Sequence, residues 1–182
     1  MISKQTFIRA RIAEIKANGA FSARIFTKNE LEELLKGGFV VKRNGKLALT
    51  DKGRKKVKVV MTGGAFDILH LGHVLTLENA KQHGDIIAVA VAHDETVKRS
   101  KKRPPIHTAK DRAKLLEKLK CVDIAIVGHP IDKMITVKRV KPDVVVYGYD
   151  QKADLRLEAK VKKLKKRLRG RQFKSSGIME DM

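Results

Sequence analysis

The sequence has few of the residues that stabilise secreted or membrane-spanning proteins. It contains a single cysteine, Cys121, so no disulfide can form within the chain, and this excludes the small disulfide-stapled domains of secreted proteins. No run of about 18 apolar residues is present to span a membrane, and no apolar export signal opens the chain. We therefore expect a cytoplasmic protein without a membrane span.

Acidic residues are also scarce. The chain has 20 Asp and Glu against 41 Lys and Arg, which gives a net charge of +21 at pH 7. Such an excess favours polyanionic partners, namely nucleotides, nucleic acids or acidic membrane surfaces. A length of 182 residues suits either one domain or a medium domain with a small one.

The most informative stretch is 57–73, VKVVMTGGAFDILHLGH. Its β-branched start, 57–61, predicts a buried strand, and Gly63 and Gly64 predict a sharp turn that brings the backbone close to a ligand. The pattern then predicts a helix over 74–83. A strand, a glycine turn and a helix start together suit phosphate binding, because backbone N–H groups and the helix dipole point at the anion.

His70 and His73 are three residues apart and would share one face of the first helical turn, beside that phosphate. Two other interpretations are open. The histidines could belong to an ordinary capped helix start, or they could be two ligands of a metal ion. Zinc would need further ligands, and neither cysteine nor carboxylate stands at suitable spacing nearby.

Five ordered segments resemble the HxGH nucleotidyltransferases, specifically the cytidylyltransferase-like branch, which includes glycerol-3-phosphate cytidylyltransferase and archaeal FAD synthase. These segments are GGAFDILHLGH, HDETVKRSKKRPPI, DRAKLLEKLKCVDIAIVG, KPDVVVYGYDQ and FKSSGIM. The resemblance covers about 56–179. It implies transfer of NMP from an NTP, ATP or CTP, to a phosphorylated small molecule, with pyrophosphate released and Mg²⁺ carried by the substrate.

The resemblance also implies roles for individual residues. The expected catalytic residues are His70, His73 and Lys98, and no residue is expected to bind a metal directly. The expected acceptor ligands are Asp67, Lys98 and Arg112. The expected nucleotide ligands are Gly64, Ala65, Phe66, His70, Leu71, Gly72, His73, Gly148, Asp150, Ser175 and Ser176. Ala65 stands where the family usually has Thr or Cys, and the family's cysteines near the C-terminus are absent.

Several of these residues have alternative interpretations. Asp67 could support the loop, hold Mg²⁺ through water, or cap the helix. The basic neighbours of Lys98 (Arg99, Lys101, Lys102 and Arg103) could substitute for it, although a mobile loop is expected over 98–103. Arg112 could instead form a surface ion pair with Asp111 or Glu117. His83, His93, His107 and His129 match no motif and are expected to be ordinary loop or surface residues.

From residue 56 on, strands alternate with helices, which predicts an α/β domain with a Rossmann-like, doubly wound parallel sheet over 56–182. Further strands are expected at 86–92, 122–127 and 144–147, and further helices at 110–119 and 131–140. Leu157, Val161, Leu164 and Leu168 have helical spacing and predict a last helix that ends at Gly170, followed by an edge strand at 171–174.

Residues 1–55 form a separate predicted domain. Helices are expected over 7–18 and 28–36, the second beginning with a capping box of Thr27 and Glu30. Asn44-Gly45 between two short β-rich runs predicts a hairpin. Helices followed by a basic hairpin resemble a winged-helix module, which suggests DNA binding; a dimerisation or packing domain is the alternative.

The leading hypothesis is an enzyme that adenylylates FMN, because HDETVK and KPDVVVYGYDQ are most similar to archaeal FAD synthase. The alternatives are a CTP-dependent cytidylyltransferase that acts on glycerol 3-phosphate or a lipid-precursor phosphate, and a nucleotide-sensing winged-helix regulator. A homodimer is also expected.

Overall fold

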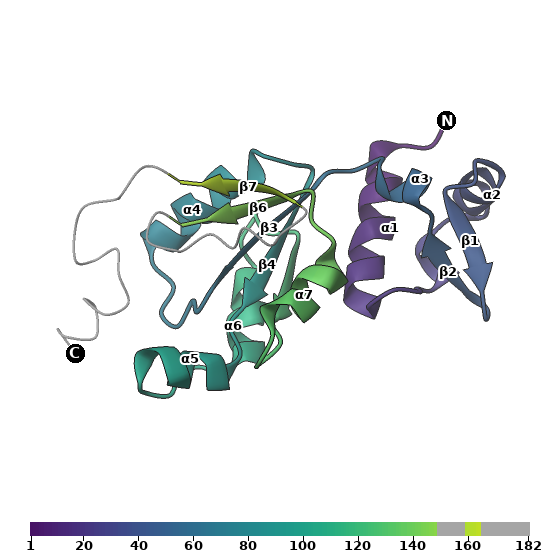
Figure 1. Ribbon diagram of the computed structural model, residues 1–182. Coiled ribbons are helices and arrows are strands. Elements are labelled where there is room, and N and C mark those ends of the chain that lie inside the picture. Colours follow the sequence, from purple (N-terminus) through teal and green to yellow (C-terminus); the bar gives the residue numbers. More distant parts are fainter. Residues whose placement is uncertain (149–158, 165–182) are drawn as a thin grey trace. The chain divides into compact units, whose positions relative to one another are not determined.

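The chain forms two compact units, Met1–Lys58 and Val59–Met182, in a computed structural model that describes residues 1–148 and 159–164 (Figure 1). The prediction placed the boundary three residues earlier, between 55 and 56. Each unit has its own buried residues, and each is described separately below.

The first unit consists of three helices, one 3₁₀ turn and a hairpin. Its elements are α1 (Lys4–Ala17), η1 (Ala23–Ile25), α2 (Lys28–Lys36), β1 (Val40–Arg43), β2 (Lys46–Leu49) and α3 (Asp51–Arg54). Thr27 and Glu30 form the predicted capping box at the start of α2. The predicted hairpin is also confirmed, with Arg43 paired to Lys46 across the Asn44-Gly45 turn.

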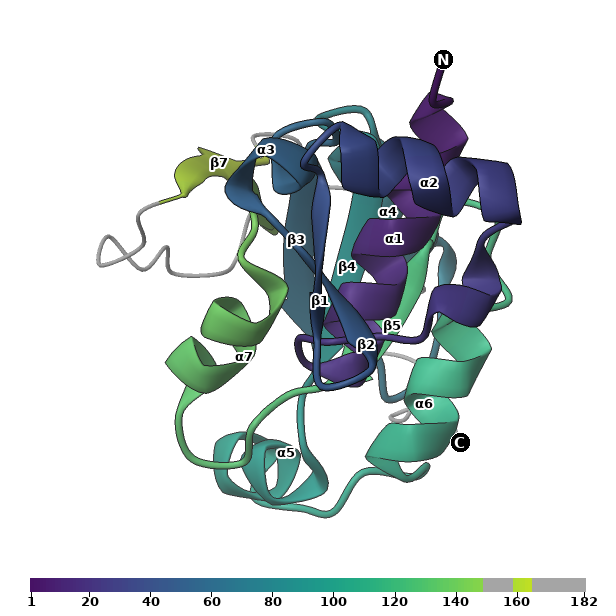
Figure 2. The ribbon, with the colours of Figure 1, turned by 90° about the vertical axis from the view of Figure 1, so that its right-hand side faces the viewer.

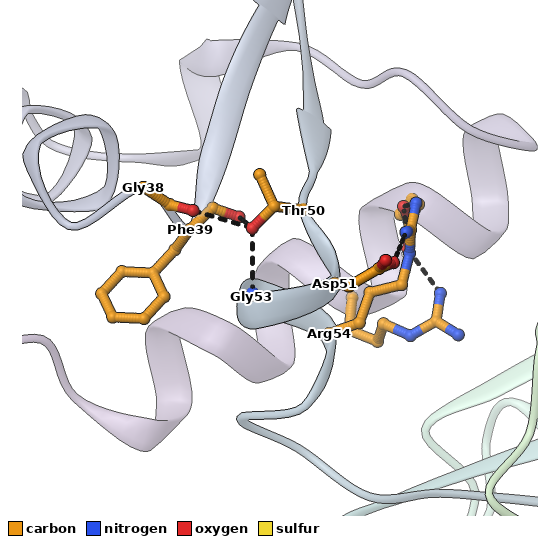
Figure 3. Close-up of polar contacts among 8 residues, drawn as sticks. Gly38, Phe39, Thr50, Asp51, Gly53 and Arg54 are labelled. Carbon is orange, nitrogen blue, oxygen red and sulfur yellow. Dashed lines mark hydrogen bonds and ion pairs between the residues drawn. The ribbon is translucent and has the colours of Figure 1, made fainter.

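A hydroxyl group fixes the base of this hairpin. Thr50 Oγ1 donates to the carbonyl oxygens of Gly38 and Phe39, at 2.8 and 3.1 Å, and accepts from the backbone N–H of Gly53 at 3.1 Å (Figure 3). Phe21 adds an antiparallel bridge to Leu47, with both backbone hydrogen bonds at 2.8 Å. The hairpin is therefore held from both sides of its second strand.

The second unit is a parallel sheet with helices between its strands. Its elements are β3 (Val59–Gly64), α4 (Leu71–Lys81), β4 (Ile86–Val91), α5 (Asp94–Lys101), α6 (Ala109–Leu116), β5 (Ile124–Val127), α7 (Lys133–Val140), β6 (Val144–Tyr147) and β7 (Lys160–Lys163). The strand order is β5-β4-β3-β6-β7, and every neighbouring pair is parallel (Figure 2). The predicted doubly wound sheet is confirmed.

The central strands β3 and β4 are buried on both faces. Val60, Ile87 and Val89 pack in one cluster with α4 and α6, while Val59 and Ile86, which point to the opposite face, are also fully buried. The sequence of a strand that is covered on both faces is a continuous apolar run. For this reason β3 and β4 could be predicted from the sequence.

The last predicted helix is wrong where the structure describes it. Residues 160–163 form strand β7, which pairs with β6 in register Val145↔Val161. The helical spacing of Val161 and Leu164 is outweighed because the open edge of β6 offers backbone hydrogen bonds. Exposed lysines along β7 suit an edge strand. The other parts of this helix and the predicted strand at 171–174 lie outside the described residues.

Candidate active site

The predicted phosphate loop lies at the carboxyl end of β3, where the strand order reverses. Chain progression runs from β3 through β4 to β5 on one side, and then continues with β6 on the other side of β3. Ligands of doubly wound sheets bind at this switch point. Gly148 directly follows β6, which is parallel to β3, so the topology brings Gly148 to the same carboxyl end of the sheet as Gly64.

The two glycines of the loop do not break the strand, contrary to the prediction. Gly63 and Gly64 are the last residues of β3 and pair with Ala90 and Val91. A Cβ on Gly64 would lie 3.1 Å from the ring of Phe66, and a Cβ on Gly63 would lie 3.2 Å from the carbonyl oxygen of Ala90, so a side chain at either position would crowd its neighbours. The chain turns at Phe66 instead, whose φ of 50° is unusual for a bulky residue. Backbone strain of this kind gathers at ligand sites.

His70 and His73 face each other at the start of α4. Their rings stack with centroids 3.8 Å apart and 22° between the planes, and the Phe66 ring lies 5.0 Å from that of His73. His70 is the N-cap residue, but within the described chain no side chain caps this helix. This corrects the alternative in which Asp67 capped it.

The Nδ1 atoms of both histidines are buried without a hydrogen-bond partner among the described residues. An unpaired buried polar atom costs about 1–3 kcal/mol, so a pair of them marks a site that a polar ligand completes. Leu71, the first helical residue, is exposed, and the carbonyl of Gly72 accepts from Thr76 Oγ1 at 2.8 Å. The backbone N–H groups at the start of α4 and the imidazoles of His70 and His73 therefore lie at the same end of this helix.

Both imidazoles are neutral near pH 7. Burial, followed by the proximity of His70 and Lys101, lowers the pKa of His73 to about 4, although a hydrogen bond with the Ile68 backbone acts in the opposite direction. Burial and Lys101 also lower the pKa of His70. Burial is the larger cause, but the contribution of Lys101 shows that a cation lies near both rings, and this favours an anion.

The cation beside the histidines is Lys101 rather than Lys98. The predicted mobile loop is wrong, because Asp94–Lys101 is helix α5 with Lys102 as its left-handed C-cap. Val97 is buried, and Lys101 is four residues further along, on the same helix face. Lys98 is exposed and forms no hydrogen bond or ion pair with the described residues, whereas the surroundings of Lys101 lower its pKa, chiefly through burial.

Asp67 ties the next loop to this site. Its buried carboxylate accepts from Arg103 Nη2 at 2.7 Å and from the backbone N–H of Ile106 at 2.8 Å. Burial alone raises the pKa of Asp67, but the hydrogen bonds from Ile106 and Arg103 outweigh it and hold the pKa below its usual value. Of the interpretations open for Asp67, loop support matches this geometry. It leaves Ile106 rigidly placed with its side chain 53% exposed.

Arg112 is buried, with 1% of its surface exposed, and its guanidinium is surrounded by protein acceptors. It donates to the carbonyl oxygens of Ala65, Ala92 and His107 and to Asp94 Oδ1. The expected surface ion pair with Asp111 or Glu117 is replaced by one with Asp94 at 2.6 Å. Arg112 therefore fastens the phosphate loop to the end of β4 and the start of α5.

Three of the predicted site residues, Asp150, Ser175 and Ser176, lie outside the described residues. Two of the histidines without a motif have structural roles instead: the Nδ1 atoms of His93 and His129 accept backbone N–H groups at the starts of α5 and of the turn before α7. Among the described residues, no group of three or more His, Cys, Asp and Glu side chains could hold a metal ion.

A family model described as "Cytidylyltransferase-like" matches residues 61–180, about two thirds of the chain. The chain belongs to this family. A FAD synthase of Pyrococcus abyssi is 48% identical over 57% of this chain and 70% of its own, and a FAD synthase of Thermoplasma volcanium is 48% identical over 58% and 74%.

Among solved structures, the crystal structure of the lipopolysaccharide core biosynthesis protein from Thermoplasma volcanium is similar. Its TM-score is 0.57 at 41% identity, over 61% of this chain and 98% of that one. The predicted family and enzyme class are thereby confirmed: this cytidylyltransferase-like chain is a nucleotidyltransferase. The match begins at residue 61, so the first unit lies outside it.

Sequence reasoning missed the residues that position this site. Asp94 was given no role of its own, and Lys101 and Arg103 were named only as substitutes for Lys98. One signal could have found Lys101: it is four residues from Val97, the apolar residue of DETVKRSK, so a helix over this segment would bring it inward.

No helix of the part that the structure describes is long and apolar enough to cross a membrane.

Proposed function

We propose that the chain transfers the adenylyl group of ATP to FMN, forming FAD and releasing pyrophosphate. The observation that carries this proposal is the stacked pair of imidazoles, His70 and His73, whose Nδ1 atoms are buried and unpaired among the described residues, at the uncapped start of α4. The pair belongs to a chain that is 48–50% identical to archaeal FAD synthases over their matched residues.

In this reaction an oxygen of the FMN phosphate attacks the α-phosphorus of ATP. A new P–O bond forms, the bond to the β-phosphate oxygen breaks, and its electron pair leaves with pyrophosphate. The protein need not form a covalent bond; it has to hold the two reactants in line and neutralise the charge of the transferring group. Preorganised donors in a water-poor site do this well.

We assign the α- and β-phosphates to the N–H groups of the first turn of α4 and to the Nδ1 atoms of His70 and His73. Lys101 adds positive charge to this site, because it is near enough to both imidazoles to lower their pKa values. Gly64, Ala65 and Phe66 shape the loop that approaches the triphosphate. Arg112 is a positioning residue, since its guanidinium is already bonded to the carbonyl of Ala65.

We propose that Mg²⁺ enters with the triphosphate. Both oxygens of Asp67 are already acceptors, from Arg103 and Ile106, and Asp94 is paired with Arg112. Neither carboxylate is therefore well placed to replace water on an incoming ion. Mg²⁺ uses few protein oxygens in phosphate sites, which agrees with such a site.

Ile106 supports a flat, apolar acceptor such as the isoalloxazine ring of FMN. Its backbone is fixed by Asp67, two prolines precede it, and its side chain is exposed beside the site. A rigidly presented apolar side chain suits an aromatic ring better than glycerol 3-phosphate.

We also propose a cytoplasmic enzyme and a homodimer, and DNA binding as a second function of the first unit.

A pyrophosphate-release assay that crosses ATP and CTP with FMN, glycerol 3-phosphate and phosphocholine tests the proposal, with FAD identified by chromatography. We expect turnover with ATP and FMN and little with the other pairs. Turnover mainly with CTP would favour the cytidylyltransferase alternative. If nucleotide binds but no pair turns over, the nucleotide-sensing regulator is favoured. His70→Ala with His73→Ala serves as the inactive control.

A further inference from the structure

We propose that the first unit grips the phosphate backbone of duplex DNA with the tip of its β1–β2 hairpin, and that α2 does not enter a groove. The inference deepens the second function proposed above and is independent of adenylyl transfer. Residues 1–58 carry 15 Lys and Arg against five Asp and Glu. The family match begins at residue 61 and does not cover this unit. Within the unit, the charges are not evenly spread.

The hairpin tip concentrates cations. Lys42, Arg43 and Lys46 are all exposed, and residues 40–49 contain no acidic side chain. Arg43 and Lys46 are direct cross-strand partners, an arrangement in which like charges destabilise a hairpin. None of the three forms a hydrogen bond or ion pair with the residues that the structure describes. An anion from outside the chain would relieve this repulsion.

The hairpin is also held firmly enough to present these charges. Thr50 ties its base to Gly38, Phe39 and Gly53, as Figure 3 shows, and the bridge from Phe21 holds Leu47. Beneath it, the buried Glu14 carboxylate binds both Arg11 and Arg54. A preorganised tip loses little conformational freedom when it binds, which strengthens a contact made by only a few residues.

Helix α2 is weakly acidic, with Glu30, Glu32 and Glu33 against Lys28 and Lys36. The order of helix, bridged segment, short turn, helix and hairpin resembles a winged helix, in which α2 would be the groove-reading element. Yet Glu32 and Glu33 are exposed on α2, and each would face phosphates if the helix entered a groove. Glu33 is partly offset by the amino group of Met1 at 3.4 Å, but Glu32 has no partner in the described chain. Backbone contact by the hairpin avoids this repulsion.

The test is fluorescence anisotropy of the full chain with a labelled mixed-sequence duplex, from about 50 to 200 mM salt. One variant carries Lys42→Gln, Arg43→Gln and Lys46→Gln. The matched control carries Lys110→Gln, Lys118→Gln and Lys120→Gln, which are exposed residues of the second unit, so both variants lose the same net charge.

If three phosphate contacts are made at the tip, the hairpin variant should reduce the salt slope of log K by about 2.7 and weaken binding by roughly 500-fold near 100 mM salt. The control should keep the wild-type slope. Adenylyl transfer and thermal stability should be unchanged in the hairpin variant, because its three residues have no partners. Equal weakening in both variants, or no binding by the wild type, would overturn the proposal.

A third variant tests α2 directly. Glu32→Gln with Glu33→Gln should change the affinity by less than about threefold if the helix stays away from the backbone. A gain of tenfold or more would place α2 against the phosphates and overturn the hairpin assignment. Because these assays measure DNA affinity, their failure would leave adenylyl transfer untouched, and an inactive enzyme would leave the DNA result interpretable.

Discussion

The low pKa of His73 predicts that nucleotide binding takes up a proton. In the free protein its pKa is about 4, so at pH 6 only about 1% of His73 is protonated. A phosphate charge about 4 Å away, at an effective dielectric of about 20, contributes roughly 4 kcal/mol, which is about three pKa units. Binding should therefore raise the pKa of His73 to about 7.

The rings of His70 and His73 are 3.8 Å apart, so they repel when both are charged and should share a single proton. We expect uptake of about 0.9 proton at pH 6, and an affinity that falls by nearly tenfold for each unit of pH above 7. The measurement is calorimetry with a non-hydrolysable ATP analogue and Mg²⁺, in buffers of different ionisation enthalpy.

Two variants decide the outcome. His70→Ala combined with His73→Ala should abolish the uptake, whereas His107→Ala, which changes an exposed histidine, should preserve it. Uptake that persists in the double variant, or that is below about 0.2 proton in the wild type, would mean that the triphosphate does not lie against these imidazoles.

Three further predictions concern the groups around the histidines. Lys101→Ala should lower kcat/KM by about 10²–10³, the effect of removing one preorganised donor, while Lys98→Ala changes it less than about threefold; equal effects would contradict the assignment of Lys101, rather than Lys98, to the site. Arg112→Met should lower the free energy of unfolding, measured in urea, by about 3–5 kcal/mol, because it leaves Asp94 and buried carbonyls unpaired; a loss under about 1 kcal/mol would contradict this. Ile106→Ser should raise KM for FMN several-fold and leave KM for ATP unchanged, and a reversed pattern would move Ile106 to the nucleotide half of the site.

The elements that could be predicted are those specified by local pattern. The apolar run of β3, the Asn44-Gly45 hairpin and the Thr27–Glu30 capping box each depend on a few adjacent residues, and each is present. The alternation of strands and helices predicted the parallel sheet for the same reason. The motif around His70 and His73 likewise identified the family, which the comparisons confirm.

The rest depended on partners far apart in sequence. Arg112 was expected to bind the acceptor or to form a surface ion pair; its buried, structural role was not predicted because its partners Ala65, Ala92 and Asp94 lie 18 to 47 residues away. Residues 160–163 became a strand because the edge of β6 was open to pairing. The basic segment ending at Lys101 was taken for a loop because its charge suggested repulsion. Docking of Val97 into the core and a capped start outweighed that repulsion.

The carboxylate of Asp67 should couple stability to acceptor binding. Asp67→Asn preserves the shape but replaces one acceptor with a donor, so either the bond from Arg103 or the bond from the Ile106 N–H to residue 67 is lost. We expect a loss of about 2–4 kcal/mol in unfolding free energy and a higher KM for FMN, because Ile106 is no longer held. Asp111→Asn, which alters an exposed carboxylate whose pKa is also lowered, chiefly by its hydrogen bond with Thr108, should destabilise the protein much less than Asp67→Asn. The pKa of Asp67 is lowered in the folded protein, so its stabilisation is complete above the unfolded pKa of about 4 and is lost as the pH falls through the folded value. The stability difference between wild type and Asp67→Asn should therefore shrink in acid; a difference that is constant down to pH 3 would show that the charge of Asp67 does not hold this loop.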